Sequence, residues 1–405
     1  MAEIKSALEG IRVLDLGRHQ AAPRAAHIMA RLGAEVIKIE PRGNNETRTA
    51  LPRVRGLSTH WISMNAGKKS LSMDLRTDKA KEILRELVKV SDVFIQNFRP
   101  GTIAKMGFSW DVLNALNPRI IMCNISAYGQ YGPFHERVGL DVVGQAMSGH
   151  MSLTGYPETP PVRSFFSLVD RTTALHGVIG VLAALNAREL TGEGQTVDVC
   201  LADSGYSWME DTLIGYLANG TVPERRGNRA RGGPANTFMA KDGYILILAS
   251  NKNVWERLCR LLNKPEWLAN PELRTQDGRL KHVVMLEREI GEWVSQYTMD
   301  EAADILNKAE IACQPVNDIR RATQEAQLWE RGLLWEAEHP YDGGKVHVPG
   351  MAIKLSDSEP PRGPLSAPGQ HTEELLTGVL NYTPEDVERL HQDRVVYKIQ
   401  PGIPE

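Results

Sequence analysis

The chain has 405 residues, a length that is ample for a large core and typical of two or three domains. Its 47 lysines and arginines against 50 aspartates and glutamates give a formal charge of -3 with both signs dispersed, which argues against a binder of nucleic acid or of anionic membranes. The opening residues MAEIKSALEG do not follow a signal-peptide pattern, and no uninterrupted apolar run approaches the roughly 20 residues of a membrane span, so a soluble, cytoplasmic protein with no membrane partner is expected.

The first half of the chain alternates strand-like and helix-like segments. Residues 11–16 and 36–39 are apolar runs on either side of an amphipathic stretch at 23–32. Further strands are predicted at 71–75, 93–98 and 120–126, and a helix that Asp78 could cap carries apolar residues at helical spacing, namely Ile83, Leu84, Leu87 and Val88. This alternation predicts a Rossmann-like α/β domain, built on a parallel sheet with helical crossovers.

The second half contains one more crossover and then a change of composition. A buried helix is predicted over 172–189, ended by Gly192 and Gly194, before a strand at 196–201. The segment VPERRGNRARGGP is typical of a linker, and the strand at 243–248 and the helices at 254–262, 285–297 and 299–309 predict a smaller α+β domain. We therefore expect a large domain at 1–221, a linker at 222–234, a small domain at 235–330, and a linker with a C-terminal segment at 331–405 that returns to the large domain and holds a helical tail at 371–390.

Four cysteines, Cys123, Cys200, Cys259 and Cys313, lie far apart and form no CxxC pair. The spacing indicates neither a disulfide framework nor a zinc site. Buried free thiols are the expected state.

The first strand-to-helix turn reads Arg18-His19-Gln20-Ala21-Ala22-Pro23. It lies where open α/β sheets bind ligands, beyond the carboxyl end of a strand and at a helix N-terminus. It contains no GxGxxG dinucleotide fingerprint, and such turns are often only connections. Gln20 is the informative residue, because a side-chain amide can hydrogen-bond both a carbonyl and a carboxylate.

Asp170 lies in the segment SFFSLVDRTTALHGV, just before the long predicted helix. Aspartate is among the preferred N-caps, so a capping role explains the residue without any catalysis. The same position also suits a nucleophile, because a helix N-terminus favours the ionised carboxylate that a nucleophile must be. The local sequence leaves both interpretations open.

Basic residues follow several of the predicted strands, namely Arg42, Arg48, Arg99 and Lys105. Either a solvated surface or a pyrophosphate ligand near these loops explains them. The segment QNFRPG at 96–101 ends a strand with an amide, Asn97, and an aromatic ring, Phe98, which suit an adenine or a ribose. It then turns sharply at Pro-Gly.

Taken together, stretches in order along the chain resemble the class III CoA-transferase family, the group of formyl-CoA and carnitine CoA-transferases. They are LEGIRVLDLGRHQAAP with GAEVIKIEPRG, NAGKKSLSMDLR, FIQNFRPGTIAKMGF, GQAMSGHMSLTG, LAALNARELTGEGQTVDVCLAD and PGQHTEELL. The match runs nearly end to end, and the first and fifth stretches carry most of it.

The resemblance implies an enzyme that moves coenzyme A from an acyl-CoA donor, with succinyl-CoA as a candidate, to a carboxylic acid. Asp170 occupies the position of the family's covalent aspartate, and Gln20 that of a glutamine expected to orient the acyl carbonyl or the aspartyl anhydride. Coenzyme A is then a substrate, and no tightly bound cofactor or metal is needed. The residues expected around it are Arg18, His19, Arg42, Leu71, Met73, Leu75, Asn97, Phe98, Arg99, Lys105 and Met106.

The chain departs from the family pattern in two places. Some relatives carry a glycine run that closes over the intermediates, whereas only Gly232-Gly233 and the stretch at 249–251 lie in comparable regions here. The 2-methylacyl-CoA racemases of the same fold have a histidine base in a Gly-His-Asp motif, and this chain reads Gly139-Leu140-Asp141. Without that histidine, two-base proton exchange at the α carbon lacks one of its bases.

Two rival functions stay open: an acyl-CoA racemase or epimerase, and a non-catalytic partner subunit of a heteromeric CoA-transferase. Retention of Asp170 and Gln20 argues against a silent subunit. The resemblance also implies an interlocked-ring dimer, in which the small domain and its linkers close a ring around the other chain. A homodimer is expected, with a heteromer of related chains as the alternative.

Overall fold

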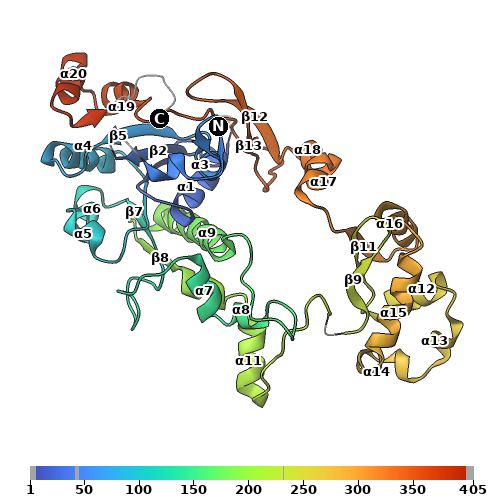
Figure 1. The fold of residues 1–405 in the computed structure, drawn as a ribbon. Helices are drawn as coiled ribbons and strands as arrows, with labels where there is room; N and C mark the ends of the chain where they lie inside the picture. The colour runs from blue at the N-terminus through green and yellow to red at the C-terminus, as the bar shows by residue number, and fades with distance from the viewer. Residues whose placement is uncertain (1–5, 42–44, 231, 398–405) are drawn as a thin grey trace. The chain divides into compact units, whose positions relative to one another are not determined.

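The computed structural model describes residues 6–41, 45–230 and 232–397 (Figure 1). The chain divides into two compact units. The larger unit comprises Met1–Met151, Arg163–Gly220 and Gln327–Glu405, and the smaller unit comprises Ser152–Val162 and Thr221–Ala326. The chain therefore enters the smaller unit twice and returns each time to the larger one.

The larger unit is built on a seven-stranded sheet with the order β14-β5-β2-β1-β6-β7-β8. Six strands are parallel, and β14 adds an antiparallel edge to β5. This confirms the predicted α/β class with a large parallel sheet. In sheet order the strands are β14 (Val396–Tyr397), β5 (Lys69–Met73), β2 (Glu35–Glu40), β1 (Arg12–Asp15), β6 (Val93–Gln96), β7 (Ile121–Ser126) and β8 (Thr196–Cys200).

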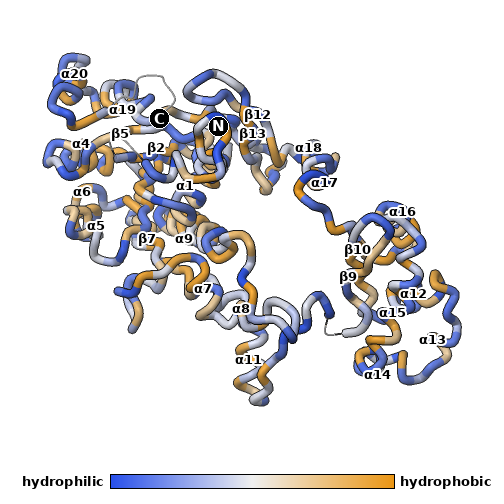
Figure 2. The backbone as a smooth tube through the Cα atoms, in the orientation of Figure 1, coloured by the Kyte–Doolittle hydropathy of each residue, from blue (hydrophilic) through white to orange (hydrophobic). Residues whose placement is uncertain are grey.

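Alternate residues of the central strands supply two hydrophobic cores, because successive side chains of a strand point to opposite faces. Leu14 pairs in register with Ile37 and Phe94, and all three belong to the core that includes α4 (Asp78–Lys89) and the C-terminal helices. Val13 pairs with Val36 and Val93 in the core that includes α1 (Ala21–Arg31) and α9 (Leu168–Thr191). Both faces of the sheet are therefore covered. Hydrophobic and hydrophilic residues alternate along α4 in Figure 2, as expected for a helix with one buried face.

Helix α9 begins earlier than the sequence predicts and ends as predicted. Its N-cap is Ser167, so Asp170 is the third residue of the helix and not its cap. Gly192 ends it in the left-handed conformation at φ 79°, which a glycine adopts without strain. The helix is long and apolar enough to match a membrane span by those two criteria. Part of that character is explained by packing on α1 and β7, because 44% of the matching window is buried and its contact residues belong to a protein core.

The remaining elements of the larger unit are short. Helix α4 is capped by Thr77, whose side chain accepts from the N–H of Ala80, and not by Asp78. The others are α2 (Glu46–Thr49), β3 (Arg53–Val54), β4 (Leu57–Ser58), α3 (Thr59–Asn65), α5 (Thr102–Lys105), α6 (Trp110–Leu116), α7 (Asp141–Met147), α8 (His150–Leu153), α10 (Leu201–Tyr206), α11 (Glu210–Asn219), α18 (Ala326–Glu330), β12 (Leu334–Glu338), β13 (Lys345–Pro349), α19 (Thr372–Gly378) and α20 (Pro384–Gln392).

The smaller unit has a three-stranded antiparallel sheet with β10 (Tyr244–Leu248) between β9 (Ala235–Met239) and β11 (Ala312–Pro315). Its helices pack around one core, in which the rings of Trp255 and Trp267 stack 5.4 Å apart. These helices are α12 (Lys252–Leu261), α13 (Pro265–Ala269), a 3₁₀ turn (Glu272–Arg274), α14 (Gln276–Lys281), α15 (Val283–Val294), α16 (Met299–Lys308) and α17 (Ile319–Gln324).

The four cysteines are free thiols, as the sequence predicts. Cys123, Cys200 and Cys259 are buried, and Cys313 is partly buried. Burial raises the pKa of Cys123 to about 12, which makes this thiol a poor nucleophile.

Candidate active site

The turn between β1 and α1 presents one buried amide without a partner. Gln20 is the N-cap of α1 and is 5% exposed. Its Oε1 has no hydrogen-bond partner among the described residues. His19, the residue before it, has φ 58°, a backbone conformation that residues other than glycine rarely adopt. A buried side-chain oxygen without a hydrogen-bond partner, next to a residue in an unusual backbone conformation, is typical of a ligand-binding site.

A buried ion cluster holds this turn in place. The two oxygens of Asp15 accept from Lys38 at 3.1 Å and from Lys68 at 2.7 Å, and Oδ1 also accepts the N–H of Gly17 at 2.8 Å. Lys38 reaches the carbonyl of Gly17, and Lys68 reaches that of Pro23 at 2.7 Å. Burial alone would raise the pKa of Asp15, but the two ammonium groups lower it, so the carboxylate stays ionised. The cluster therefore fixes the backbone on both sides of Gln20.

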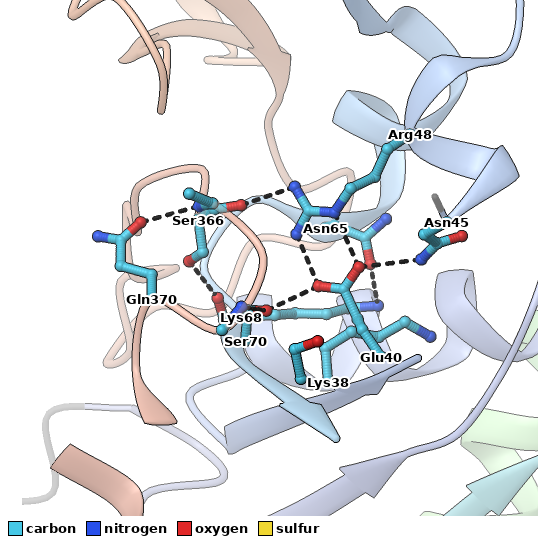
Figure 3. Close-up of polar contacts among 12 residues, drawn as sticks. Lys38, Glu40, Asn45, Arg48, Asn65, Lys68, Ser70, Ser366 and Gln370 are labelled. Atoms are coloured by element: carbon cyan, nitrogen blue, oxygen red, sulfur yellow. Dashed lines mark hydrogen bonds and ion pairs between the residues drawn. The ribbon is translucent and has the colours of Figure 1, made fainter. Parts of the chain in front are cut away.

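A second buried ion pair joins Glu40 at the end of β2 to Arg48 of α2 (Figure 3). Arg48 of α2 donates to both oxygens of Glu40, at 2.6 and 2.8 Å, and lies 3.8 Å from the centre of the Trp61 ring. The same guanidinium donates to the carbonyl of Ser366 at 2.9 Å, so it ties α2 to the C-terminal segment. Burial would raise the pKa of Glu40, but Arg48 outweighs it and lowers the pKa to about 2. Arg48 is therefore neither the solvated residue nor the phosphate ligand that the sequence suggests.

Asp170 is held through its backbone by a second carboxylate. Its N–H donates to Oδ1 of Asp141 at 3.0 Å, and Oδ2 of Asp141 accepts from Gln145 at 2.5 Å. Gln145 in turn accepts the N–H of Ser164 at 2.9 Å. Asp141 is 7% exposed and begins α7. This chain of bonds leaves both carboxylate oxygens of Asp170 without a protein donor among the described residues, which suits a group that must react.

The ionisation of Asp170 differs from the expectation based on the helix N-terminus. Burial raises its pKa from the ordinary value of 3.8 to about 7, and the neighbouring Asp141 carboxylate adds to that rise. Arg24 and Arg171 lower it but do not outweigh the first two causes. Near neutral pH the group therefore exchanges its proton readily, a property that clusters at functional sites.

Arg24 is a site residue that the sequence analysis missed. It lies one turn after Gln20 in α1, and its backbone N–H donates to the carbonyl of Gln20 at 2.9 Å. Burial lowers the pKa of its guanidinium to about 10, with a further decrease from Arg171 and an opposite effect from Asp170. Its Nε is buried and has no partner among the described residues. An arginine among the alanines of AAPRAAHIMA was the signal that could have found it.

A cavity of about 700 Å³ opens beside these groups, and we call it the histidine cavity. Burial lowers the pKa of His60 in its wall, and Arg24 and Arg171 contribute to the decrease, so His60 is neutral at physiological pH. The lining residues are His19, Glu46, Thr47, Ala50, Leu51, Pro52, Thr59, His60, Ser63, Phe165, Phe166 and Arg171.

A separate cavity of about 520 Å³, the methionine cavity, lies at the ends of β1, β2 and β5. It brings together several residues that the family resemblance assigns to coenzyme A. These are Arg18, Met73, Leu75, Phe98 and Met106. The other lining residues are Leu16, Gly17, Lys38, Ile39, Glu40, Pro41, Asn45, Asp74 and Arg76.

The remaining residues expected around coenzyme A lie elsewhere. Leu71 is fully buried in the core, and His19 lines the histidine cavity. Asn97 accepts from the N–H of Arg18 at 2.7 Å and donates to its carbonyl at 2.8 Å, so it orders the turn. Arg99 and Lys105 are exposed and outside the methionine cavity lining, and Arg42 lies outside the described residues.

One ion pair links a lining residue of each cavity. Arg18 lines the methionine cavity, Glu46 lines the histidine cavity, and their side chains are 2.7 Å apart. Two consecutive residues also line different cavities, because Arg18 lines the methionine cavity and His19 lines the histidine cavity.

Two further sequence features have a definite place. Leu140, where the racemase motif has histidine, is 66% exposed and precedes α7. The two candidate lid segments belong to the smaller unit and are joined by the buried Arg279. Its guanidinium donates to the carbonyl of Gly232 at 3.4 Å and to that of Ser250 at 2.8 Å.

Comparison with known proteins places the chain among enzymes of one kind. The family described as CoA-transferase family III matches residues 8–372. The chain is 32% identical to formyl-CoA:oxalate CoA-transferase of Rhodopseudomonas palustris strain BisA53, over 95% of this chain and 96% of the relative. It is 34% identical to succinyl-CoA:glutarate CoA-transferase of Mus musculus, over 95% and 88%. The crystal structure of a CaiB/BaiF family protein from Brucella suis superimposes with a TM-score of 0.83 at 30% identity, covering 93% of this chain and 100% of that one.

Proposed function

Because the chain belongs to CoA-transferase family III, we propose that it moves coenzyme A from an acyl-CoA donor to a carboxylic acid, with Asp170 as the covalent carrier. The observation that carries this proposal is the state of Asp170. Its carboxyl has a pKa near 7 and interacts electrostatically with Arg24. Arg24 lies one helical turn after Gln20, whose Oε1 has no hydrogen-bond partner among the described residues. Such a group is a more basic carboxylate than an ordinary aspartate and, once ionised, can act as the nucleophile.

In the first half of the reaction, a carboxylate oxygen of Asp170 attacks the thioester carbonyl carbon of the donor. The carbon–sulfur bond breaks, which gives a mixed anhydride and a CoA thiolate. The thiolate then attacks the aspartyl carbonyl carbon, the anhydride carbon–oxygen bond breaks, and the donor acid leaves as a carboxylate. Asp170 is now a thioester of coenzyme A.

In the second half, the acceptor carboxylate attacks the aspartyl thioester and releases the CoA thiolate. The thiolate attacks the acceptor acyl carbon of the new anhydride, which yields the product acyl-CoA and restores the Asp170 carboxylate. No net proton, metal or redox group enters the balance. Gln20 would donate its side-chain N–H to the oxyanion of each tetrahedral intermediate, and Arg24 would stabilise the departing carboxylate of Asp170.

Coenzyme A would lie in the methionine cavity, with its thiol end directed past the Arg18–Glu46 pair to the histidine cavity. Phe98 and Met106 offer the flat apolar surface that an adenine needs. Arg18 and Arg76 would bind phosphates by exchanging their present partners, Glu46 and Asp74, for the phosphate oxygens. Succinyl-CoA is the donor we propose to test first, since relatives are named for it. The free cysteines fit a reducing compartment, so we place the reaction in the cytoplasm.

We further propose that the protein acts as an interlocked dimer, closed by the linkers at 222–234 and after 331. Several apolar side chains of the larger unit are exposed, which supports burial of this surface against a partner chain. Ile179 of α9 is 63% exposed, and Leu217 of α11 is 82% exposed. Light scattering should give twice the chain mass, and a fully active species of one chain mass would refute the dimer.

Mass spectrometry tests the covalent step directly. Wild-type protein incubated with succinyl-CoA should carry an adduct on the peptide that contains Asp170, which hydroxylamine removes. Asp170→Ala should lose CoA transfer by several orders of magnitude, while Asp111→Asn, an exposed aspartate in the first turn of α6, should keep it. An unmodified Asp170 peptide, or appreciable turnover by Asp170→Ala, would rule out the assignment. Solvent deuterium entering the α carbon without an acceptor acid would instead favour the racemase alternative.

A further inference from the structure

The histidine cavity has one permanent cation in its wall. Among its described lining residues Arg171 alone is an arginine or lysine. The one carboxylate of the wall, Glu46, is already paired with Arg18 at 2.7 Å. His60 is neutral at physiological pH, because burial and the neighbouring cations lower its pKa. The charge on Arg171 therefore has no carboxylate of the cavity wall to pair with.

Arg171 and Arg24 share one anionic neighbour. In the described part of the chain no carboxylate lies within 4.0 Å of either guanidinium, and Asp170 is the carboxylate that acts on Arg24 from a greater distance. In the proposed mechanism Asp170 loses its charge when it becomes an anhydride or a thioester. At the thioester stage the CoA sulfur is uncharged as well, so neither the carrier nor coenzyme A's sulfur then offers an anion to the two guanidinium groups, one of which is largely buried.

We propose that the histidine cavity selects acids that carry a second carboxylate, and that Arg171 pairs with that second carboxylate while Asp170 is acylated. This inference rests on the proposed function and adds the class of acid to it. Arg171 is then a specificity-determining residue and takes no part in bond making.

The rest of the cavity suits the chain between two carboxylates. Phe165, Phe166 and Leu51 line it with apolar surface against which methylene groups can pack. The guanidinium of Arg171 lies 5.6 Å from the centre of the Phe166 ring, a contact that orients its planar face. A guanidinium fixed in this way can bind a carboxylate with two parallel hydrogen bonds.

The test compares each dicarboxylic acid with its own monoamide, which has the same skeleton without the second charge. Malonate, succinate, glutarate and adipate and their monoamides are offered as acceptors with a donor that the wild type uses, and kcat/KM is measured for each. For at least one chain length we expect wild type to prefer the diacid by roughly 10- to 100-fold, the range for one charge-assisted pair.

Three variants separate specificity from a general loss. Arg171→Gln should bring the preference close to one by lowering kcat/KM for the diacid more than for the monoamide, and Arg171→Lys should restore part of it. Arg163→Gln removes the same charge from an exposed residue outside the cavity wall and should keep the wild-type preference. Circular dichroism of each variant checks the fold.

Two results would overturn the inference and leave the proposed function standing. One is a wild type that transfers coenzyme A but does not distinguish diacids from monoamides. The other is an Arg171→Gln variant that loses activity equally with both, with an acid limb of the pH profile shifted upward, because that pattern belongs to a residue that only tunes Asp170. Absence of transfer to every acid, together with an unmodified Asp170, would overturn both proposals.

Discussion

Replacement of Asp170 by asparagine should stabilise the protein, and more so at higher pH. Asparagine keeps the shape of the side chain and the backbone N–H that donates to Asp141, but it cannot ionise. Because the folded pKa of Asp170 is raised, the folded state binds this proton more tightly than the unfolded chain does. The contribution of protonated Asp170 to the free energy of unfolding is therefore fully present below the ordinary pKa of 3.8. It is lost progressively as the pH rises to about 7.

The magnitude follows from the shift in pKa from 3.8 to about 7. Ionising the half-buried carboxyl costs the folded wild type about 1.5 kcal/mol at pH 5 and about 4 kcal/mol at pH 8. The neutral amide of the Asp170→Asn variant has no such cost at either pH. The stability advantage of Asp170→Asn should thus grow by up to about 2.5 kcal/mol between pH 5 and pH 8, which for a unit of this size is on the order of 5 °C in Tm.

Thermal melts of wild type and Asp170→Asn at pH 5, 6, 7 and 8 measure this difference directly. Asp111→Asn is the control, because Asp111 also lies in the first turn of a helix but is exposed. Its Tm should track that of wild type at every pH. If the gap between Asp170→Asn and wild type were the same at pH 5 as at pH 8, the carboxyl would not lie in surroundings that raise its pKa, and the explanation of its reactivity would fail.

Four other outcomes can be checked. The kcat/KM of wild type should rise with pH through about 7, since only ionised Asp170 attacks the thioester. Arg24→Gln should move this acid limb of the pH profile to higher pH, because Arg24 lowers the pKa of Asp170. An acid limb that does not move would contradict the role of Arg24. Gln20→Ala should lower the single-turnover rate constant about 10²- to 10³-fold without lowering Tm, as expected for the loss of a side-chain N–H that donates to an oxyanion. Phe98→Ala should weaken CoA binding about 10-fold or more by calorimetry, while kcat at saturation changes little; equal affinity would exclude the methionine cavity as the nucleotide site. Arg48→Met should lower the free energy of unfolding by about 3–5 kcal/mol in urea titrations, because it leaves Glu40 buried and unpaired.

The sheet could be predicted in outline because its central strands are apolar runs bounded by turns. The strands that escaped prediction include β9, β12 and β13, each of five residues, and two that are short or polar. β14 has two residues, and β11 reads ACQP, so each is a strand only because β5 or β10 pairs with it. Local propensity cannot supply that information, since tertiary pairing overrides it.

The site divides in the same way. The place of Gln20 follows from topology, since the turn after the first strand of such a sheet is a ligand position. The ionisation of Asp170 does not follow from its own helix, because it is decided by burial and by Asp141, a residue from another helix. The histidine cavity escaped prediction because its walls come from 46–63 and 165–171, segments without a regular pattern.

The division of the β1–α1 turn has a consequence for how such a protein can change over evolutionary time. Arg18 and His19 are covalent neighbours, yet they line different cavities. On the proposed assignment, the nucleotide end of the substrate is bound by residues that the acid never meets. Substitutions confined to the walls at 46–63 and 165–171 could then change which acid is bound, while the residues that bind coenzyme A stay the same. A family of transferases that share one carrier and differ in their acids is what such a partition would produce.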